Sequence, residues 1–141
     1  MIKETNDYDT LSRMFHECGL EIEIEAQPPE GTLNMWKWEE DGQLVGGSVL
    51  SVRDGRYVLA DLAVRAPWRE KGIGLQLMDM VLEEARRRGA EEIWACAKIP
   101  EYYLTKGWEE MDRATSPEIS NCQTCEQFNV TCFPCIIRKD L

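Results

Sequence analysis

The chain has 141 residues, with 16 Lys and Arg against 26 Asp and Glu and a formal net charge of −10. This length is that of one domain with its own core, and an apolar fraction of 43% with 30% charged residues is typical of a soluble globular protein and excludes a disordered chain. The acidic balance argues against nucleic acids and anionic membranes as partners, because both are bound mainly through Lys and Arg.

The N-terminal sequence carries no targeting signal. Residues 1–10, MIKETNDYDT, lack the basic and then apolar order of a signal peptide, and no apolar run is long enough to span a membrane. We therefore expect the protein in the cytoplasm. No linker rich in Gly or Ser divides the sequence, so we also expect a single domain over residues 1–141.

The N-terminal half predicts one helix followed by three antiparallel strands. Leu11, Met14 and Phe15 lie on one face of a helix over residues 10–18, and Gly19 follows as a stop signal. The last strand of the three is nearly all apolar, which favours a central, buried position. The predicted strands cover residues 33–38, 43–52 and 57–64, with turns at Glu40-Asp41-Gly42 and Asp54-Gly55.

A helix over residues 74–88 is the clearest element of the sequence. It is followed by a strand at 92–97, and a strand–helix–strand order predicts a parallel pair inside a mixed sheet. A short helical run over 101–106 ends at Gly107, and a last strand covers 134–139. The apolar stripe predicted for the long helix consists of Leu75, Met78, Leu82 and Ala85, with Val81 beside it.

The six residues before and at the start of that helix, REKGIG at 69–74, favour an anion site. The first N–H groups of a helix have no partner within the helix and carry partial positive charge, and glycines let an anion approach them. Arg69 and Lys71 add formal positive charge. A phosphate or pyrophosphate is therefore expected here, while a tight strand-to-helix turn is the alternative that a Gly-x-Gly pattern alone leaves open.

The sequence around this loop, DLAVRAPWREKGIGLQLMDMVLEEARRRG, closely resembles the acetyl-CoA-binding motif of the GNAT N-acetyltransferases. The resemblance implies an α/β (α+β) fold of GNAT type, a mixed and largely antiparallel sheet flanked by helices, with acetyl-CoA as cosubstrate. It also implies that the loop amides hold the pyrophosphate and that the strand end pairs with the pantetheine arm. The implied cofactor-binding residues are Leu62, Ala63, Val64, Arg69, Glu70, Lys71, Gly72, Ile73 and Gly74.

A second motif, YYLTKGW at 102–108, is similar to a later motif of the same family and implies that Tyr103 lies near the thioester sulfur. A tyrosine hydroxyl, with an ordinary pKa near 10, can protonate a departing thiolate without being ionised at pH 7. Asp61 is the candidate base. The alternatives are packing for Tyr103 and a structural carboxylate for Asp61. Cys96 stands where the family often has an Asn, so the coenzyme contact of that Asn is in question.

A cysteine-rich stretch over residues 121–135 is absent from the general family pattern. Its two Cys-x-x-Cys pairs could offer four thiolates at the tetrahedral geometry that Zn²⁺ prefers. Reduced cysteines used for packing, disulfides and an iron–sulfur cluster are the alternatives. The candidate metal ligands are Cys122, Cys125, Cys132 and Cys135.

The function expected from these features is transfer of an acetyl group from acetyl-CoA to a primary amine, by direct attack in a ternary complex. The acceptor is a small-molecule or peptide amine that the sequence does not name, and the oligomeric state stays open, a homodimer included. Two other functions remain as alternatives. One is a catalytically silent acyl-CoA-binding or sensing domain, and the other is a metal or redox sensor that works through the C-terminal cysteines.

Overall fold

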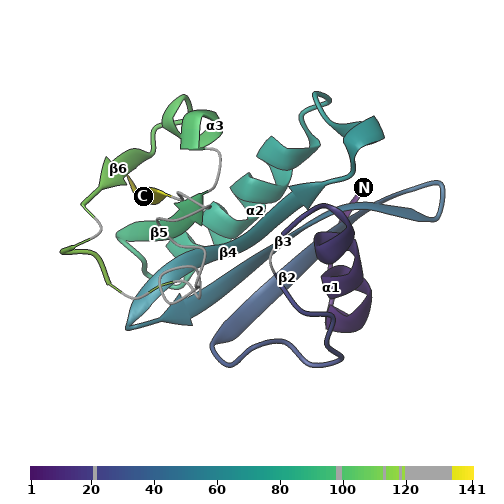
Figure 1. Cartoon of the computed structure of the whole chain (residues 1–141), viewed down its shortest axis with the longest axis horizontal. Coiled ribbons are helices and arrows are strands. Elements are labelled where there is room, and N and C mark those ends of the chain that lie inside the picture. Colours follow the sequence, from purple (N-terminus) through teal and green to yellow (C-terminus); the bar gives the residue numbers. More distant parts are fainter. Residues whose placement is uncertain (21, 98–99, 113, 118, 120–134) are drawn as a thin grey trace.

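A computed structural model describes residues 1–20, 22–97, 100–112, 114–117, 119 and 135–141. In this part of the chain the strands form one seven-stranded sheet of order β1-β2-β3-β4-β5-β7-β6 (Figure 1). The neighbours are antiparallel except β4 and β5, which are parallel, as the strand–helix–strand order predicts. The elements are β1 (Ile2–Glu4), α1 (Tyr8–Glu17), β2 (Thr32–Glu40), β3 (Gln43–Arg53), β4 (Arg56–Val64), the 3-10 helix η1 (Ala66–Trp68), α2 (Ile73–Arg87), β5 (Glu92–Ala97), α3 (Pro100–Leu104), β6 (Glu109–Met111) and β7 (Cys135–Asp140).

Both hairpins of the predicted three-stranded meander turn at Asp-Gly pairs. Asp41 and Gly42 have φ values of 50° and 77°, and Asp54 and Gly55 have φ values of 50° and 71°. Positive φ at both central residues is the geometry of the tight turns whose twist matches that of paired strands, and Asp-Gly is a favoured sequence for it. The turns predicted from the sequence are confirmed at both positions.

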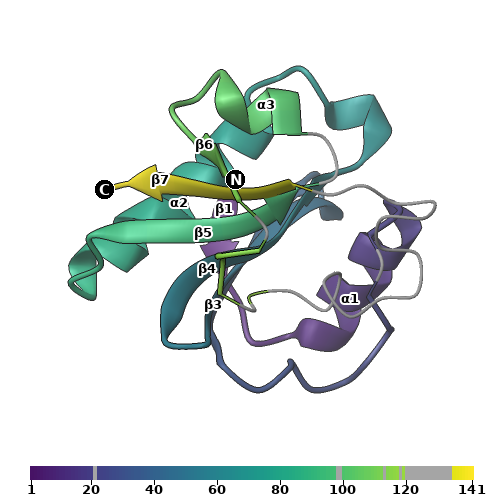
Figure 2. The ribbon, with the colours of Figure 1, turned by 60° about the vertical axis from the view of Figure 1, so that its left-hand side comes forward.

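Helices α1 and α2 cover opposite faces of the sheet, as Figure 2 shows. α2 packs into the larger core cluster, where Leu77, Val81 and Ala85 are fully buried. α1 packs into a second cluster on the other face, through Leu11 and Phe15 among others. A mixed, largely antiparallel sheet flanked by helices is therefore confirmed.

The predicted apolar stripe of α2 is wrong at one position. Leu75 is 42% exposed, whereas Leu77, which the prediction left out, is fully buried. α2 begins at Ile73, and residues four apart from Ile73, namely Leu77 and Val81, return to the face that meets the sheet. Leu75 lies two residues, or about 200°, from Ile73 around the helix and therefore points away from the sheet.

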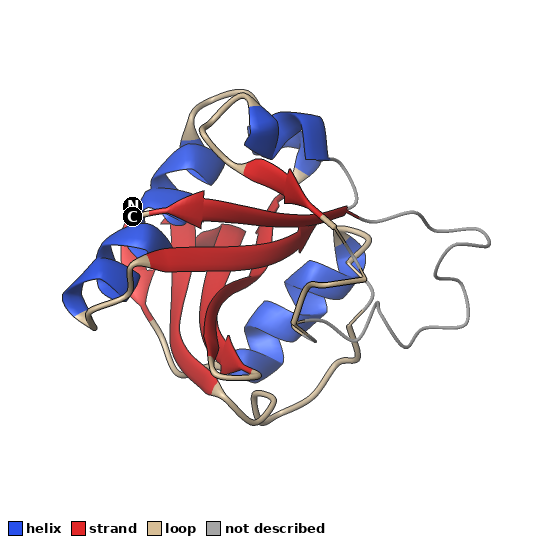
Figure 3. Ribbon diagram, turned by 90° about the vertical axis from the view of Figure 1, so that its left-hand side faces the viewer, coloured by secondary structure: helices blue, strands red, loops and turns tan. Residues whose placement is uncertain are grey.

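The elements that the sequence did not predict are three residues long each, which is too short for a periodic pattern. They are β1, η1 and β6. α1 starts at Tyr8 rather than at residue 10, because the Asp7 carboxylate accepts the Thr10 N–H at 3.1 Å and caps the helix. The last strand, β7, lies between β5 and β6 and ends at the C-terminus (Figure 3). Among the helices in the described ranges, none is long and apolar enough to cross a membrane.

Candidate functional site

The parallel strands β4 and β5 separate soon after they meet. They share a single residue pair, Val58 with Trp94, and both continue beyond it. The pairing of β4 with β3 shifts between Val49 and Leu50, which leaves Ala60 as an extra residue in β4. Such a bulge bends a strand and increases its twist. The bulge therefore explains why β4 turns away from β5 just past Val58.

The backbone of β4 beyond the bulge presents hydrogen-bonding groups to the side that β5 has left. The Arg65 N–H donates to the Val45 carbonyl on β3 at 2.8 Å. Because backbone groups alternate in direction along a strand, Ala63 also faces β3, whereas Leu62 and Val64 face the opening. Val64 O accepts a bond from Arg69 Nε at 2.8 Å. The remaining groups of Leu62 and the Val64 N–H form a strand edge that an extended ligand can pair with.

The glycine loop that follows contains two left-handed residues. Glu70 has φ of 65° and Gly72, at the N-cap of α2, has φ of 80°. Left-handed residues among right-handed ones turn successive N–H groups toward one concave side, which binds anions. A Cβ built on Gly72 would meet nothing within 4 Å, so the outer side of the loop is open.

The backbone donors of this loop are available. Within the described part of the chain, no N–H group from Glu70 to Leu75 has a hydrogen-bond partner. The Arg69 N–H, by contrast, donates to the Ala66 carbonyl at 3.2 Å. The run of free donors thus begins one residue later than the loop predicted from the sequence. It coincides with the positive end of the α2 dipole and with the exposed Lys71, both of which favour an anion.

The residues of the YYLTKGW motif pack over the start of α2. A Cβ built on Gly74 would lie 3.2 Å from the Tyr102 hydroxyl oxygen, so glycine allows this close approach. The rings of Tyr102 and Tyr103 meet edge to face at 5.3 Å, and those of Tyr103 and Trp108 at 5.7 Å. Lys106 Nζ lies 4.3 Å from the centre of the Tyr102 ring. The two motifs of the sequence are therefore neighbours in space.

Asp61 and Tyr103, the two candidate catalytic residues, lie within electrostatic range of each other. Burial raises the pKa of Tyr103 to about 12, and the neighbouring Tyr102 and the Asp61 carboxylate add to the rise. Burial likewise raises the pKa of Tyr8 on α1 to about 12, and the same Asp61 carboxylate contributes there. Asp61 therefore lies where tyrosines from α1 and from α3 both sense its charge.

The bulge in β4 accounts for this position of Asp61. Leu59 packs into the α2-side cluster, and strict alternation would place Asp61 and Ala63 on that side as well. Ala63 packs instead with the α1-side cluster, because the extra residue, Ala60, reverses the alternation. Asp61 is two residues before Ala63 and therefore lies on the same face of the sheet, the one that α1 covers. Tyr8 is not among the candidate residues predicted from the sequence, although it lies three residues before Leu11 and so on the same face of α1.

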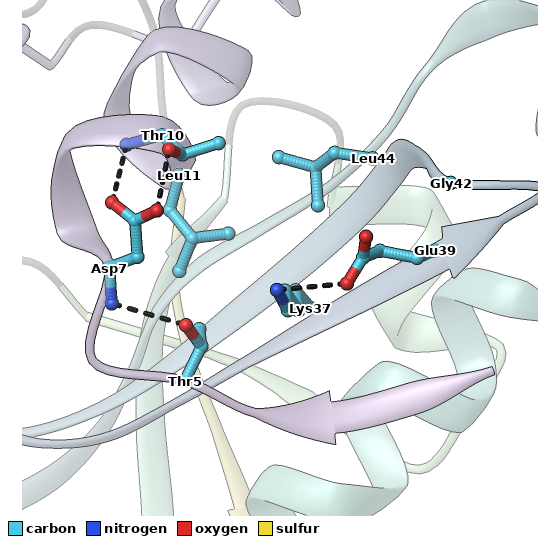
Figure 4. Close-up of a pocket in the computed structure, with 8 residues that line it drawn as sticks. All are labelled: Thr5, Asp7, Thr10, Leu11, Lys37, Glu39, Gly42 and Leu44. Carbon is cyan, nitrogen blue, oxygen red and sulfur yellow. Dashed lines mark hydrogen bonds and ion pairs between the residues drawn. The ribbon is translucent and has the colours of Figure 1, made fainter.

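A cavity of about 150 Å³ lies between the start of α1 and the β2–β3 hairpin (Figure 4). Its polar groups pair with one another: the Asp7 carboxylate accepts from the Thr10 hydroxyl at 2.7 Å, and Lys37 contacts Glu39 at 2.8 Å. The residues that line this cavity include neither Asp61 nor Tyr103, nor any residue of the glycine loop. We therefore do not assign the chemistry of the protein to this cavity.

Most of the candidate metal ligands lie outside the residues that the structure describes. Cys122, Cys125 and Cys132 lie outside the described residues, and Cys135 begins β7 with its thiol 3.4 Å from Glu110 Oε1. Among the residues that are described, no group of three or more His, Cys, Asp or Glu side chains is placed to hold a metal ion. The zinc site therefore stays a prediction.

Solved structures of similar fold include several that contain coenzyme A. N-acetylglutamate synthase from Neisseria gonorrhoeae, complexed with coenzyme A and N-acetyl-glutamate, matches with a TM-score of 0.72 at 17% identity over 100% of this chain and 35% of that one. This chain thus spans about a third of the synthase's length. Naa50 from Arabidopsis thaliana, in complex with the bisubstrate analogue CoA-Ac-MVNAL, matches with a TM-score of 0.69 at 15% identity over 99% of each chain.

A GNAT-family acetyltransferase from Staphylococcus aureus Mu50 matches with a TM-score of 0.68 at 17% identity, over 100% of this chain and 99% of that one. At identities of 15–17%, the similarity to these structures shows that the fold is shared. The family follows from the sequence itself, because the model of the acetyltransferase (GNAT) family matches residues 3–102, which is more than half of the chain. The protein belongs to the GNAT acetyltransferase family.

Proposed function

We propose that this protein transfers the acetyl group of acetyl-CoA to a primary amine. The observation that carries the proposal is the run of free N–H groups from Glu70 to Leu75, placed beside the end of a strand that has parted from its parallel neighbour. A pyrophosphate needs such convergent donors. The pantetheine arm is an extended chain with two amides, and a strand edge is suited to pair with it.

The proposed cosubstrate site uses the sequence candidates in different ways. Glu70, Lys71, Gly72, Ile73 and Gly74 offer their N–H groups to the pyrophosphate. Leu62 and Val64 offer backbone groups to the pantetheine arm. The backbone of Ala63 faces β3, so this residue contributes by holding β4 in register. Arg69 links the loop to the strand, because its side chain binds the Val64 carbonyl.

The chemical step needs one proton to leave nitrogen and one to reach sulfur. The neutral amine attacks the thioester carbonyl carbon and forms the new C–N bond, and the C–S bond then breaks. Asp61 accepts the proton from nitrogen, directly or through a water molecule, and the Tyr103 hydroxyl gives its proton to the thiolate. Coenzyme A leaves as the free thiol, and Tyr103 recovers a proton from Asp61 through solvent. The products are the amide and the thiol.

The electrostatic link between Asp61 and Tyr103 suits this order of events. Burial, followed by smaller contributions from Tyr102 and the Asp61 charge, keeps Tyr103 protonated while the amine approaches. A tyrosine with a pKa of about 12 is, however, a weak acid toward a thiolate, whose pKa is near 8.5. When Asp61 accepts the amine proton, its negative charge is lost, and the pKa of Tyr103 falls by the part that this charge contributed, while burial and Tyr102 still raise it. Deprotonation of the amine therefore prepares Tyr103 to donate.

A panel of amines tests the proposal. Purified protein is incubated with acetyl-CoA and, separately, polyamines, amino acids, aminoglycosides or peptides, and acetylated products are detected by mass spectrometry. We expect product with at least one class and a strong loss of product in Tyr103→Phe. Binding of acetyl-CoA without product from any class would instead support a silent acyl-CoA-binding domain. Absence of binding would contradict the proposed site itself.

A further inference from the structure

The closed end of the β4–β5 opening is filled by large apolar side chains. Val58 and Trp94, the single residue pair that these two strands share, are 2% and 7% exposed. They form a separate core cluster with Ile119 and Ile136, both fully buried. This cluster lies on the face opposite α2, because the alternate residues of β5 pack against α2. The opening therefore ends at an apolar wall, which consists of the side chains of Val58, Trp94, Ile119 and Ile136.

Part of this wall comes from outside the region that the family model matches. Ile119 follows β6 in the chain, whereas the match ends at residue 102. The Ile119 carbonyl accepts a hydrogen bond from Arg53 Nη1 at 2.9 Å, which ties it to the end of β3. A residue held both by burial and by this hydrogen bond is a firm component of the wall, and it is a feature of this chain's own C-terminal part.

The wall stands in line with the acyl group of a bound thioester. The glycine loop is at the C-terminal end of β4, so the pantetheine arm runs from there toward the start of the strand. If Asp61 is the base, as the proposed function has it, the reacting carbonyl would lie near Asp61, which is on the face opposite α2. From the bulge residue Ala60 to Val58 is two residues, or about 7 Å of strand. An acyl chain longer than a few carbons that continued in this direction would meet the indole of Trp94 and the side chain of Ile119, which pack with Val58.

We propose that Trp94 and Ile119 determine which acyl groups the protein accepts, and that they restrict it to short ones such as acetyl. This inference rests on the proposed function, because it assumes an acyl-CoA in the β4–β5 opening. Trp94 acts through its bulk, since its buried indole N–H has no hydrogen-bond partner among the described residues. Replacing the indole with a smaller apolar side chain thus removes volume and breaks no hydrogen bond to the described residues.

The test compares acetyl-CoA with hexanoyl-CoA in Trp94→Leu and in Ile119→Ala. Affinities measured by calorimetry need no turnover, and the ratio of kcat/KM values is measured with any amine that is acetylated. We expect the wild type to prefer acetyl-CoA and both variants to shift the hexanoyl-to-acetyl ratio upward by about tenfold or more, the effect of methylene-sized space in a hydrophobic pocket. Trp36→Leu is the matched control, because Trp36 is also a buried tryptophan but belongs to β2 and the α2-side cluster.

An unchanged ratio in folded Trp94→Leu and Ile119→Ala would overturn the inference, and so would a wild type that accepts hexanoyl-CoA as well as acetyl-CoA. If the larger truncations do not fold, Ile119→Val removes a single methyl group. Its hexanoyl-to-acetyl ratio should then rise above that of the wild type, and an unchanged ratio would overturn the inference. A wild type that binds no acyl-CoA at all would contradict the proposed function. The two failures can be told apart. If only the further inference is wrong, the wild type still binds acyl-CoA, but the variants leave its chain-length preference unchanged.

Discussion

Substitution of Gly72 by Asp isolates the contribution of the glycine loop to cosubstrate binding. Gly72 is the N-cap of α2, its φ is 80°, and a Cβ there meets nothing within 4 Å. The new side chain therefore adds backbone strain and a negative charge but causes no clash. Asn at the same position adds nearly the same bulk and tolerates the left-handed conformation equally well, without the charge. The Asp-to-Asn comparison thus measures the charge alone.

The size of the effect follows from Coulomb's law for a side chain at position 72 beside a phosphate bound at the loop. A carboxylate about 5 Å from one phosphate charge, at an effective dielectric constant near 20, raises the free energy of the complex by about 3 kcal/mol. This corresponds to a Kd weakened roughly a hundredfold. The same carboxylate can accept the free N–H groups at the start of α2 and interact favourably with the helix dipole, by about 0.3–1 kcal/mol. The free energy of unfolding should therefore fall little, and less than in Gly55→Asp.

Calorimetric titration with coenzyme A measures the three variants. Gly55→Asp is the control for strain, because Gly55 has a φ of 71°, equally open space, and lies in the hairpin that precedes β4. We expect wild-type affinity in Gly55→Asp, a modest loss in Gly72→Asn and roughly a hundredfold larger loss in Gly72→Asp than in Gly72→Asn. Equal affinities of the Asp and Asn variants at position 72 would refute an anion site at this loop.

Further predictions concern the tyrosines, Asp61 and the cysteines. Tyr103→Phe should lower kcat by roughly ten- to a thousandfold and leave the acetyl-CoA affinity nearly unchanged, and unaltered turnover would exclude it as the acid. Asp61→Asn should lower kcat, and raising the pH should not restore it, which a pH–rate profile checks. Tyr8 and Tyr103 have pKa values of about 12 in the folded protein, above the ordinary value of 10. The free energy of unfolding should therefore fall as the pH rises from 10 to 12. Tyr8→Phe should reduce that fall, which denaturant titrations at several pH values would measure. If the late cysteines hold Zn²⁺, metal analysis should find about one equivalent, lost in the Cys122→Ser, Cys125→Ser double variant; metal-free protein with freely titrating thiols would contradict this.

Local signals in the sequence predicted most of the elements. The Asp-Gly turns at 41–42 and 54–55 predict the meander because few other pairs tolerate two positive φ values in succession. β5 matches its predicted bounds, and α2 differs by one residue at each end, since both carry strong periodic patterns. The loop at 69–74 could be predicted for the same reason: it depends on glycine conformations and on a helix start, which are both local.

The features that the sequence analysis missed depend on contacts between distant segments. Nothing in the sequence of β4 marks Ala60 as a bulge, because the extra residue is defined only by the register with β3. The side on which Asp61 lies follows from that bulge, and with it the proximity of Tyr8 and Tyr103. The contact of Ile119 with Val58 and Trp94 is equally remote from local pattern, because it brings together residues from three separate segments.

The most direct test of the account follows backbone amide resonances by NMR while coenzyme A is added. The N–H groups from Glu70 to Leu75, together with those of Leu62 and Val64, should shift and become protected from hydrogen exchange. The N–H of Ala63, which faces β3, should be protected before the addition and change less. Chemical-shift changes gathered elsewhere, with the resonances of Glu70 to Leu75 unaffected at saturation, would contradict the placement of the cosubstrate in the β4–β5 opening.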